Sequence, residues 1–251
     1  MALAIGGIGL YSISTYIGYH AYRIYQLPPA AQHDPQQQRN YKHLWDTMGD
    51  YDARIDSDEY WLGITSKRAR VIEQAAGSVL EVCSGTSRNI DLYRPDKVDL
   101  LIQSDESASM LNDAIAKYQR LKDKLNGLEV VFTKMPATAL EYSDNSFDTV
   151  VDTFGLCSCQ DPIKMIKEMG RVCKPDGKIL LLEHGRGFSD WLNDILDRTV
   201  EGHAMKWGCH WNRDIMRLVE ESGLAVQDVE RFHFGTTMAI VLQPNRQSTN
   251  V

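Results

Sequence analysis

Apolar runs of six to eight residues recur along the middle of this chain, and they limit its fold more than any other feature. They are rich in Val, Leu and Ile, as expected of strands buried on both faces. The runs lie at 78–83, 98–104, 128–133, 147–154 and 177–184. Helical spacing of apolar residues separates them at 106–125 and 161–173, and residues 86–97 are long enough for a short crossover helix. This alternation predicts a parallel sheet with helices on both faces.

The C-terminal part of the chain breaks the alternation. Residues 224–234 and 236–244 are both strand-like, with only Gly235 between them. Because no crossover helix fits there, the two strands are expected to pair antiparallel as a hairpin. Residues 185–211, before the last helix, are expected to form a loop. The predicted fold class is therefore α/β, with a seven-stranded Rossmann-like sheet that an antiparallel C-terminal hairpin closes.

The N-terminal segment differs from the rest of the chain, because its first charged residue is Arg23. An apolar stretch of about 20 residues is long enough to cross a bilayer, and the tyrosines at its C-terminal end follow the aromatic pattern of a membrane interface. We interpret residues 1–25 as a transmembrane helix. The alternatives are a buried helix of the folded domain and a secretory signal peptide, although the segment lacks a basic beginning and a small-residue cleavage site.

Composition restricts the compartment and the partners. Residues 26–40, rich in proline and glutamine, are expected to form an extended linker, which leaves residues 41–251 as one domain. The net charge of −7 disfavours nucleic acid as a partner. The five cysteines are odd in number and include no C-x-x-C pair, which argues against a disulfide framework and against a zinc ribbon.

Two strand ends carry residues suited to a nucleotide-like ligand, since ligands of parallel α/β sheets bind at the carboxyl ends of the strands. Residues 80–89 follow the first strand and contain Gly85, where the backbone can approach a ligand without a Cβ in the way. Asp105 ends the second strand, 24 residues after Glu81. Its carboxylate can accept hydrogen bonds from two ribose hydroxyls. The alternative role for Asp105 is the N-cap of the following helix.

Residues 80–89 resemble the E/D-x-G-x-G-x-G loop of class I S-adenosylmethionine-dependent methyltransferases, with Cys83 and Ser87 where glycines are usual. Residues 134–151 are similar to the family stretch D-A-x-x-L-P-F-x-D-x-S-F-D-x-V, with Pro136 in place of the acid that receives the adenine amino group. The resemblance covers residues 79–186 and implies S-adenosyl-L-methionine as the cofactor. The cofactor-binding residues that it implies are Glu81, Cys83, Gly85, Thr86, Ser87, Asp105, Ala137 and Phe154.

His184 follows the fifth strand, near the place where a methyl acceptor would lie. It is the candidate catalytic residue, because an imidazole can take a proton from an acceptor at neutral pH. The alternative is a hydrogen-bonded histidine that holds the loop at 185–211. A metal site made of Glu183, His184, His203 and His210 matches no standard ligand spacing, so no metal is expected.

The N-terminal segment together with GTSRN, GLCS, LLEHGRG and HFGTT resembles the Oms-type mitochondrial membrane-anchored methyltransferase-like proteins. This finer resemblance implies a single-pass anchor in the mitochondrial inner membrane. Two functions remain open: a methyltransferase acting on a small or membrane-proximal acceptor, and a catalytically degenerate scaffold subunit of a mitochondrial membrane or ribosomal complex. Cys83, Ser87 and Pro136 favour the scaffold, while Glu81 and Asp105 favour the enzyme. A dehydrogenase fits the glycine loop and the closing hairpin poorly.

Overall fold

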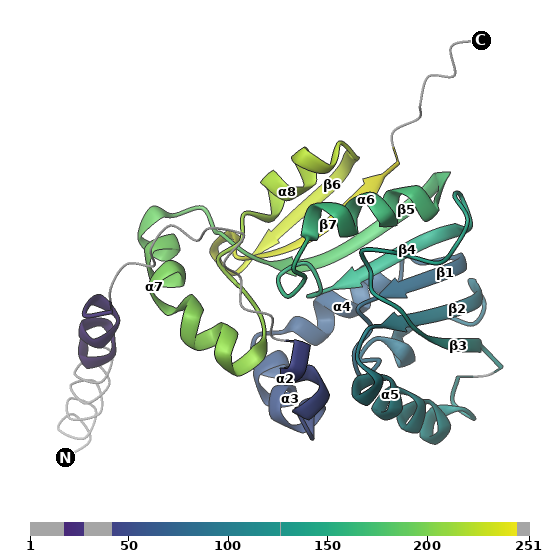
Figure 1. The fold of residues 1–251 in the computed structure, drawn as a ribbon, viewed down its shortest axis with the longest axis horizontal. Coiled ribbons are helices and arrows are strands. Elements are labelled where there is room, and N and C mark those ends of the chain that lie inside the picture. Colours follow the sequence, from purple (N-terminus) through teal and green to yellow (C-terminus); the bar gives the residue numbers. More distant parts are fainter. Residues whose placement is uncertain (1–17, 28–41, 126, 245–251) are drawn as a thin grey trace, which may run out of the picture.

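The structure is a computed structural model that describes residues 18–27, 42–125 and 127–244 (Figure 1). Residues 18–25 are helical. The helices are α2 (Lys42–Thr47), α3 (Tyr51–Trp61), α4 (Ile64–Ile72), the 3-10 turn η2 (Ile90–Leu92), α5 (Ala108–Leu121), α6 (Pro162–Val172), α7 (Asp190–Trp207), α8 (Ile215–Ser222) and the 3-10 turn η3 (His233–Gly235). The strands are β1 (Gly77–Val82), β2 (Val98–Asp105), β3 (Glu129–Lys134), β4 (Phe147–Thr153), β5 (Cys173–His184), β6 (Ala225–Phe232) and β7 (Thr237–Gln243).

The seven strands form one mixed sheet in the order β3-β2-β1-β4-β5-β7-β6. The first five are parallel, whereas β7 runs antiparallel to both β5 and β6. The predicted sheet and its closing hairpin are therefore confirmed. Because β1 has β2 on one side and β4 on the other, the chain reverses its winding direction at β1. The carboxyl ends of these strands thus form the crevice in which doubly wound sheets bind ligands.

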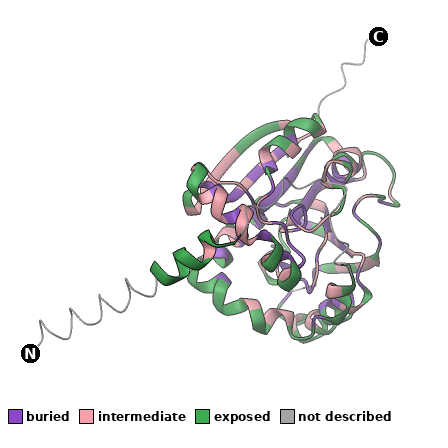
Figure 2. Cartoon of the chain, turned by 60° about the vertical axis from the view of Figure 1, so that its left-hand side comes forward, coloured by how far each residue is buried: buried purple, intermediate pink, exposed green. Residues whose placement is uncertain are grey.

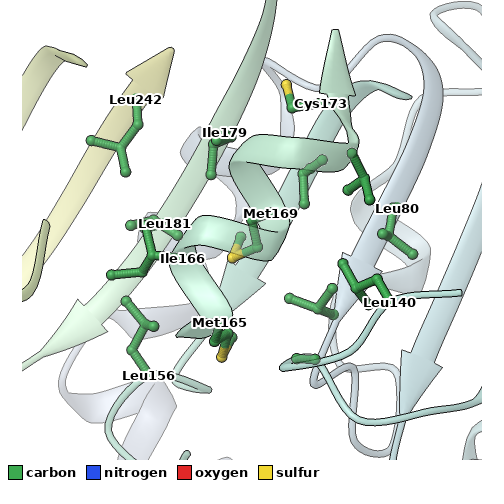
Figure 3. Packing of buried hydrophobic residues seen from close by; sticks show 14 of the residues in the cluster. Leu80, Leu140, Leu156, Met165, Ile166, Met169, Cys173, Ile179, Leu181 and Leu242 are labelled. Atoms are coloured by element: carbon green, nitrogen blue, oxygen red, sulfur yellow. The ribbon is translucent and has the colours of Figure 1, made fainter. Parts of the chain in front are cut away.

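Both faces of the sheet are buried, which is why its strands read as continuous apolar runs. Alternate residues of β5 point to opposite faces: Leu181 joins the cluster under α6 and α8, and Leu180 joins the cluster under α4. Figure 3 shows the first cluster, where Met165, Ile166 and Met169 of α6 lie on the sheet. Figure 2 shows that the buried residues concentrate in the sheet, while the surrounding helices turn exposed residues outward.

Two connections differ from the sequence expectations. The crossover helix expected within 86–97 shortens to the single turn η2, because Pro95 disfavours helical backbone at the preceding residue. The loop expected at 185–211 is wrong, since α7 fills most of that segment. Leu196, Val200 and Ala204 recur every fourth residue and form the buried face of α7. This four-residue spacing of apolar residues is typical of a helix and favours α7 over a loop.

Most of the anchor and linker expected at 1–25 and 26–40 lies outside the described residues. Among the helices that the structure describes, none is long and apolar enough to span a membrane. The described helix at 18–25 is mostly exposed and leads away from the body of the molecule. Its C-terminal end lies beside α7, where Arg198 donates a hydrogen bond to the carbonyl of Leu27 at 2.8 Å and stacks over the ring of Tyr25.

Candidate active site

A cavity lies at the carboxyl ends of β1, β2, β3 and β4, and we call it the strand-end cavity. Its walls come from four strand ends and from the helices that precede the sheet. The lining residues are Trp45, Tyr51, Arg68, Cys83, Ser84, Gly85, Thr86, Arg88, Asp105, Glu106, Met110, Met135, Pro136, Ala137, Thr138, Thr153, Phe154, Gly155, Ser158, Cys159, Gln160 and His210. Six of the eight expected cofactor-binding residues are among them. Glu81 and Ser87 are not.

The loop after β1 has left-handed backbone at every second residue. Cys83, Gly85 and Ser87 have φ values of 50°, 55° and 59°. These are the three positions at which the family motif has glycine, and glycine alone adopts this conformation without strain. Cys83 and Ser87 each accept a cost of about 1–2 kcal/mol. At Gly85 a Cβ would meet no atom within 4 Å, so this position borders open space in the cavity wall.

Asp105 joins the β1 loop to the end of β2. Its Oδ2 accepts a hydrogen bond from the amide of Gly85 at 2.9 Å, and its Oδ1 accepts one from the amide of Ser107 at 2.9 Å. Burial raises the pKa of Asp105, although hydrogen bonds from the amides of Ser107, Gly85 and Glu106 oppose that shift. Each oxygen retains capacity for a further donor from the cavity. The N-cap of α5 is Ser107, which accepts from the amide of Met110, so the capping alternative for Asp105 is wrong.

Glu81 and Ser87 lie beneath the loop rather than at the cavity wall. The buried Glu81 carboxylate accepts hydrogen bonds from Asn89 at 2.7 Å, from the Tyr93 hydroxyl at 2.8 Å and from Gln103 at 3.0 Å. The hydroxyl of Ser87 donates to the side-chain oxygen of Gln103. These contacts join both sides of the β1 loop to β2, and they fix the backbone that carries Gly85.

The end of β3 contributes the wall opposite the β1 loop. The amide of Met135 donates to the carbonyl of Asp105 at 3.1 Å, which ties this segment to the end of β2. Pro136 and Ala137 both line the cavity. Because proline has neither an amide donor nor a polar side chain, Pro136 offers a ligand only its carbonyl and its apolar ring surface.

The helices before the sheet cover one side of the cavity through a network of charged residues that sequence reasoning did not find. Arg88, in the β1 loop, pairs with Asp52 at 3.0 Å, Asp56 at 2.8 Å and Glu59 at 3.0 Å of α3. Asp52 also accepts a hydrogen bond from the cavity residue Thr86 at 2.6 Å. Burial opposes ionisation of Asp52 and Glu59, but their cationic partners outweigh burial and lower both pKa values. We call α2–α4 the cover.

Arg68, on α4 of the cover, joins the cover to the end of β4. Its guanidinium donates two hydrogen bonds to Glu59, at 2.8 and 3.1 Å, and one to the hydroxyl of Thr153 at 2.8 Å. It also lies over the ring of Phe154, at 4.9 Å from the centroid. Phe154 has left-handed backbone, with φ 61°, and this turn places its ring between the cavity and His184.

His184 lies behind Phe154 and does not line the strand-end cavity. The two ring centroids are 5.1 Å apart. His184 Nε2 lies 2.8 Å from Cys209 Sγ, and its ring is 6.2 Å from that of His203, which stacks on Trp211. Burial, and then the nearby His184, lower the pKa of His203 to about 4. The expected role of His184 as a direct proton acceptor would therefore require the Phe154 ring to move.

Cys157 lies in the same buried cluster as His184 and Cys209. Burial opposes ionisation of the Cys157 thiol, but the hydrogen bond with Cys209 and the charge of His184 outweigh it and lower its pKa well below the usual value. Cys159, two residues later, behaves differently: burial raises its pKa to about 11. Cys159 lines the cavity, whereas Cys157 does not.

A pair of buried acids holds the loop after β4. Asp152 Oδ1 and Glu183 Oε2 are buried and receive no hydrogen bond from the described residues, and one proton shared between these two neighbouring carboxyls would satisfy both. Glu183 Oε1 accepts from the amides of Gly155 and Leu156 at 3.1 and 3.3 Å, and Asp152 Oδ2 accepts from the amide of Leu156 at 3.1 Å. Burial, and then mutual repulsion, raise the pKa of Glu183 well above its ordinary value. Burial also raises the pKa of Asp152.

Comparison with known proteins agrees with this arrangement. Residues 80–181 match the methyltransferase domain family. Over 204 residues the chain is 34% identical to the mitochondrial methyltransferase OMS1 of Saccharomyces cerevisiae. The aligned region covers 76% of this chain and 43% of the yeast protein. The chain is 35% identical over 114 residues to the ubiquinone/menaquinone biosynthesis C-methyltransferase UbiE of Bdellovibrio bacteriovorus, covering 45% and 46% of the two chains. The chain spans about half the length of the curated relatives it matches.

Solved structures share the fold at low sequence identity. An S-adenosylmethionine-dependent methyltransferase of Aquifex aeolicus superposes with a TM-score of 0.53 at 17% identity, covering 85% of this chain and all of that chain. The [4+2]-cyclase SpnF superposes with a TM-score of 0.54 at 20% identity, covering 69% and 60%. The expected methyltransferase family is confirmed for residues 80–181, and S-adenosylmethionine, the expected cofactor, is the one that the name of the Aquifex protein gives. The cyclase is a reminder that a fold does not by itself determine a reaction.

Proposed function

The chain belongs to the methyltransferase superfamily through its domain at residues 80–181, and we propose that it transfers a methyl group from S-adenosylmethionine to a small or membrane-proximal acceptor. The observation that carries this proposal is that Gly85 and Asp105, joined by a hydrogen bond, line the same cavity. Gly85 leaves open space where the backbone can approach a ligand, and Asp105 keeps acceptor capacity on both oxygens. Both lie at the carboxyl ends of neighbouring strands, where this fold binds nucleotides.

The residues present fit this cofactor. Asp105 would accept hydrogen bonds from the ribose hydroxyls, and the backbone around Gly85 would hold the amino-acid end. Pro136 and Ala137 would cover the adenine ring with apolar surface. The cofactor supplies an activated methyl group on a sulfonium, so the protein contributes mainly by aligning the acceptor with that group and excluding water. The cover, with Trp45 and Tyr51 at the cavity wall, would provide the exclusion.

We further propose that the protein is tethered to a mitochondrial membrane by its N-terminal segment. Three findings support this. The first 22 residues contain no Asp, Glu, Lys or Arg, and the yeast relative is named as mitochondrial. Large apolar side chains are also exposed where β5 leads into α7 and at the β6–β7 turn: Phe188 is 70% exposed, Trp191 61% and Phe234 78%. Such residues suit a protein whose surface meets lipid.

Calorimetric titration of the purified protein with S-adenosylmethionine tests the proposal. Asp105→Ala should weaken binding about 10- to 150-fold, which corresponds to the roughly 1.5–3 kcal/mol of a hydrogen bond to a charged group. Gly85→Val should abolish binding, because its side chain would fill the space that the ligand needs. Asp99→Ala, at the exposed opposite end of the same strand, is the matched control and should bind like the parent. If the parent does not bind the cofactor, the enzyme proposal fails.

The scaffold alternative has a specific observation in its favour. Cys83 and Ser87 hold a strained backbone that glycine would adopt freely, as expected where selection for cofactor binding has relaxed. Complementation of a null strain by folded Gly85→Val protein distinguishes the two functions. Loss of function at normal abundance supports the enzyme, whereas full rescue supports the scaffold.

A further inference from the structure

Three side chains from separate segments meet behind the strand-end cavity. Cys157 comes from the β4–α6 connection, His184 is the last residue of β5, and Cys209 follows α7. One ligand atom from each lies within 4.8 Å of the other two. We call this group the Cys157–His184–Cys209 cluster. Cys157 and Cys209 are buried, and His184 is half-buried.

The donor atoms suit a thiophilic divalent cation. Two cysteine sulfurs and one histidine nitrogen form a ligand set that zinc uses in proteins. Zinc bonds of about 2.3 Å to sulfur and 2.0 Å to nitrogen place neighbouring tetrahedral ligands roughly 3.5–3.8 Å apart. The His184 Nε2 to Cys209 Sγ separation of 2.8 Å would have to lengthen by less than about 1 Å to admit an ion.

The backbone already holds the three segments together. The amide of His210 donates to the carbonyl of Cys157 at 2.9 Å, which fixes Cys209 beside Cys157. Gly208 ends α7 with left-handed backbone, and its amide donates to the carbonyl of Ala204 at 2.8 Å. His184 is fixed by β-pairing with Thr237. These backbone contacts hold the three ligands in place before an ion binds, which reduces the conformational entropy that metal binding would cost.

The surrounding charges also balance. Two ionised thiols neutralise a doubly charged ion. The buried Arg213 guanidinium, which acts electrostatically on Cys157 and Cys209, adds one positive charge. The Asp152–Glu183 pair, which retains one proton, adds one negative charge that acts on Cys157. An ion in the cluster would therefore leave no net charge in this buried region, as is required for it to be stable.

We propose that Cys157, His184 and Cys209 bind one Zn²⁺ ion. Three protein ligands leave a fourth tetrahedral position for water or another small ligand, as in catalytic rather than structural zinc sites. The site borders the cavity, because Phe154 packs on His184 and His210 follows Cys209, and both line the cavity wall. No zinc site was expected from the sequence, because the three ligands are 27 and 25 residues apart and form no short motif.

Metal analysis of the full-length protein, purified in detergent under reducing conditions, tests the proposal. Elemental analysis should find about one zinc per chain. After removal by a chelator, titration with Zn²⁺ alone should restore one ion and raise the unfolding temperature. Co²⁺ in its place should give the charge-transfer and ligand-field absorption of a tetrahedral thiolate site.

Variants locate the ion. Cys157→Ser, Cys209→Ser and His184→Ala should each weaken zinc binding at least about tenfold, with a cooperative melt showing that each variant folds. Cys159→Ser and Cys173→Ser are matched controls and should bind zinc like the parent. The proposal is overturned if the parent binds no zinc or if the three variants bind it unchanged. Zinc binding is measured without cofactor, so these outcomes do not depend on the proposed function.

Discussion

At the scale of single residues, the Asp152–Glu183 pair makes a pH-dependent contribution to stability. The fold raises both pKa values through burial, so the folded state keeps a proton that the unfolded chain has already lost. The stability of the pair is therefore fully present below the ordinary carboxyl pKa values and is lost as the pH rises toward the folded-state values. Between about pH 4 and pH 8, this pair should make the protein progressively less stable.

Glu183→Gln tests this contribution. The amide oxygen can still accept from Gly155 and Leu156, and its nitrogen can donate to Asp152 without a shared proton. We expect the variant to be more stable than the parent at pH 8 by about 1–3 kcal/mol, since each unit of pKa difference corresponds to about 1.4 kcal/mol. The difference should vanish near pH 4. Chemical denaturation across this range measures it, and parallel curves for parent and variant would contradict the prediction.

Glu168→Gln is the matched control, because its effect has the opposite sign. Hydrogen bonds from Arg171, with Nε and Nη2 each at 2.8 Å from a carboxylate oxygen, lower the pKa of Glu168. Its contribution is present above the ordinary carboxyl pKa and is lost as the pH falls through the lowered value. The Glu168→Gln variant should therefore be less stable than the parent at pH 7, and the two should converge in acid.

At the scale of secondary-structure elements, Arg88 should determine how firmly α3 covers the cavity. Arg88→Met keeps the length of the side chain but removes the pairs with Asp52, Asp56 and Glu59. We expect faster amide hydrogen exchange in Tyr51–Trp61, with little change in β1 and β4, and faster dissociation of bound S-adenosylmethionine. Arg94→Met is the control: Arg94 is half-exposed and pairs with Asp96 two residues later. Uniformly faster exchange across the sheet would mean that Arg88 stabilises the whole fold instead.

The elements also show which parts of this molecule the sequence could predict. The strands and the closing hairpin follow from local patterns, because strands buried on both faces leave continuous apolar runs. The β1 loop was recognised as a motif, and the structure adds that the motif positions share left-handed backbone. The cover could not be predicted in the same way, because Arg88 lies 29–36 residues after its partners on α3. The spacing of charged residues along a sequence does not show which of them pair in the fold. The meeting of Cys157, His184 and Cys209 depends on the packing of α7, a helix in a segment that the sequence pattern predicts to be a loop.

At the scale of the whole molecule, the N-terminal segment and the exposed aromatic side chains make separate predictions about membranes. The full-length protein should remain with membranes after an alkaline carbonate wash, because a spanning helix is released only when the bilayer is dissolved. A variant lacking residues 1–40 should be released. Recovery of the full-length protein in the wash would show that the segment does not span the membrane.

The shortened protein then isolates the second contribution. Phe188 and Phe234 lie next to each other, since the amide of Phe188 donates to the carbonyl of Phe234 at 3.1 Å, and Trp191 follows within the first turn of α7. If this patch meets lipid, the protein lacking residues 1–40 should still bind phospholipid vesicles weakly, and Phe188→Ser with Phe234→Ser should lower that binding at least about tenfold, because each buried aromatic side chain contributes roughly 1.5–3 kcal/mol. Trp61→Ser is the control: Trp61 is 80% exposed but belongs to α3. Equal loss from both changes would mean that general hydrophobicity, rather than this patch, controls the binding.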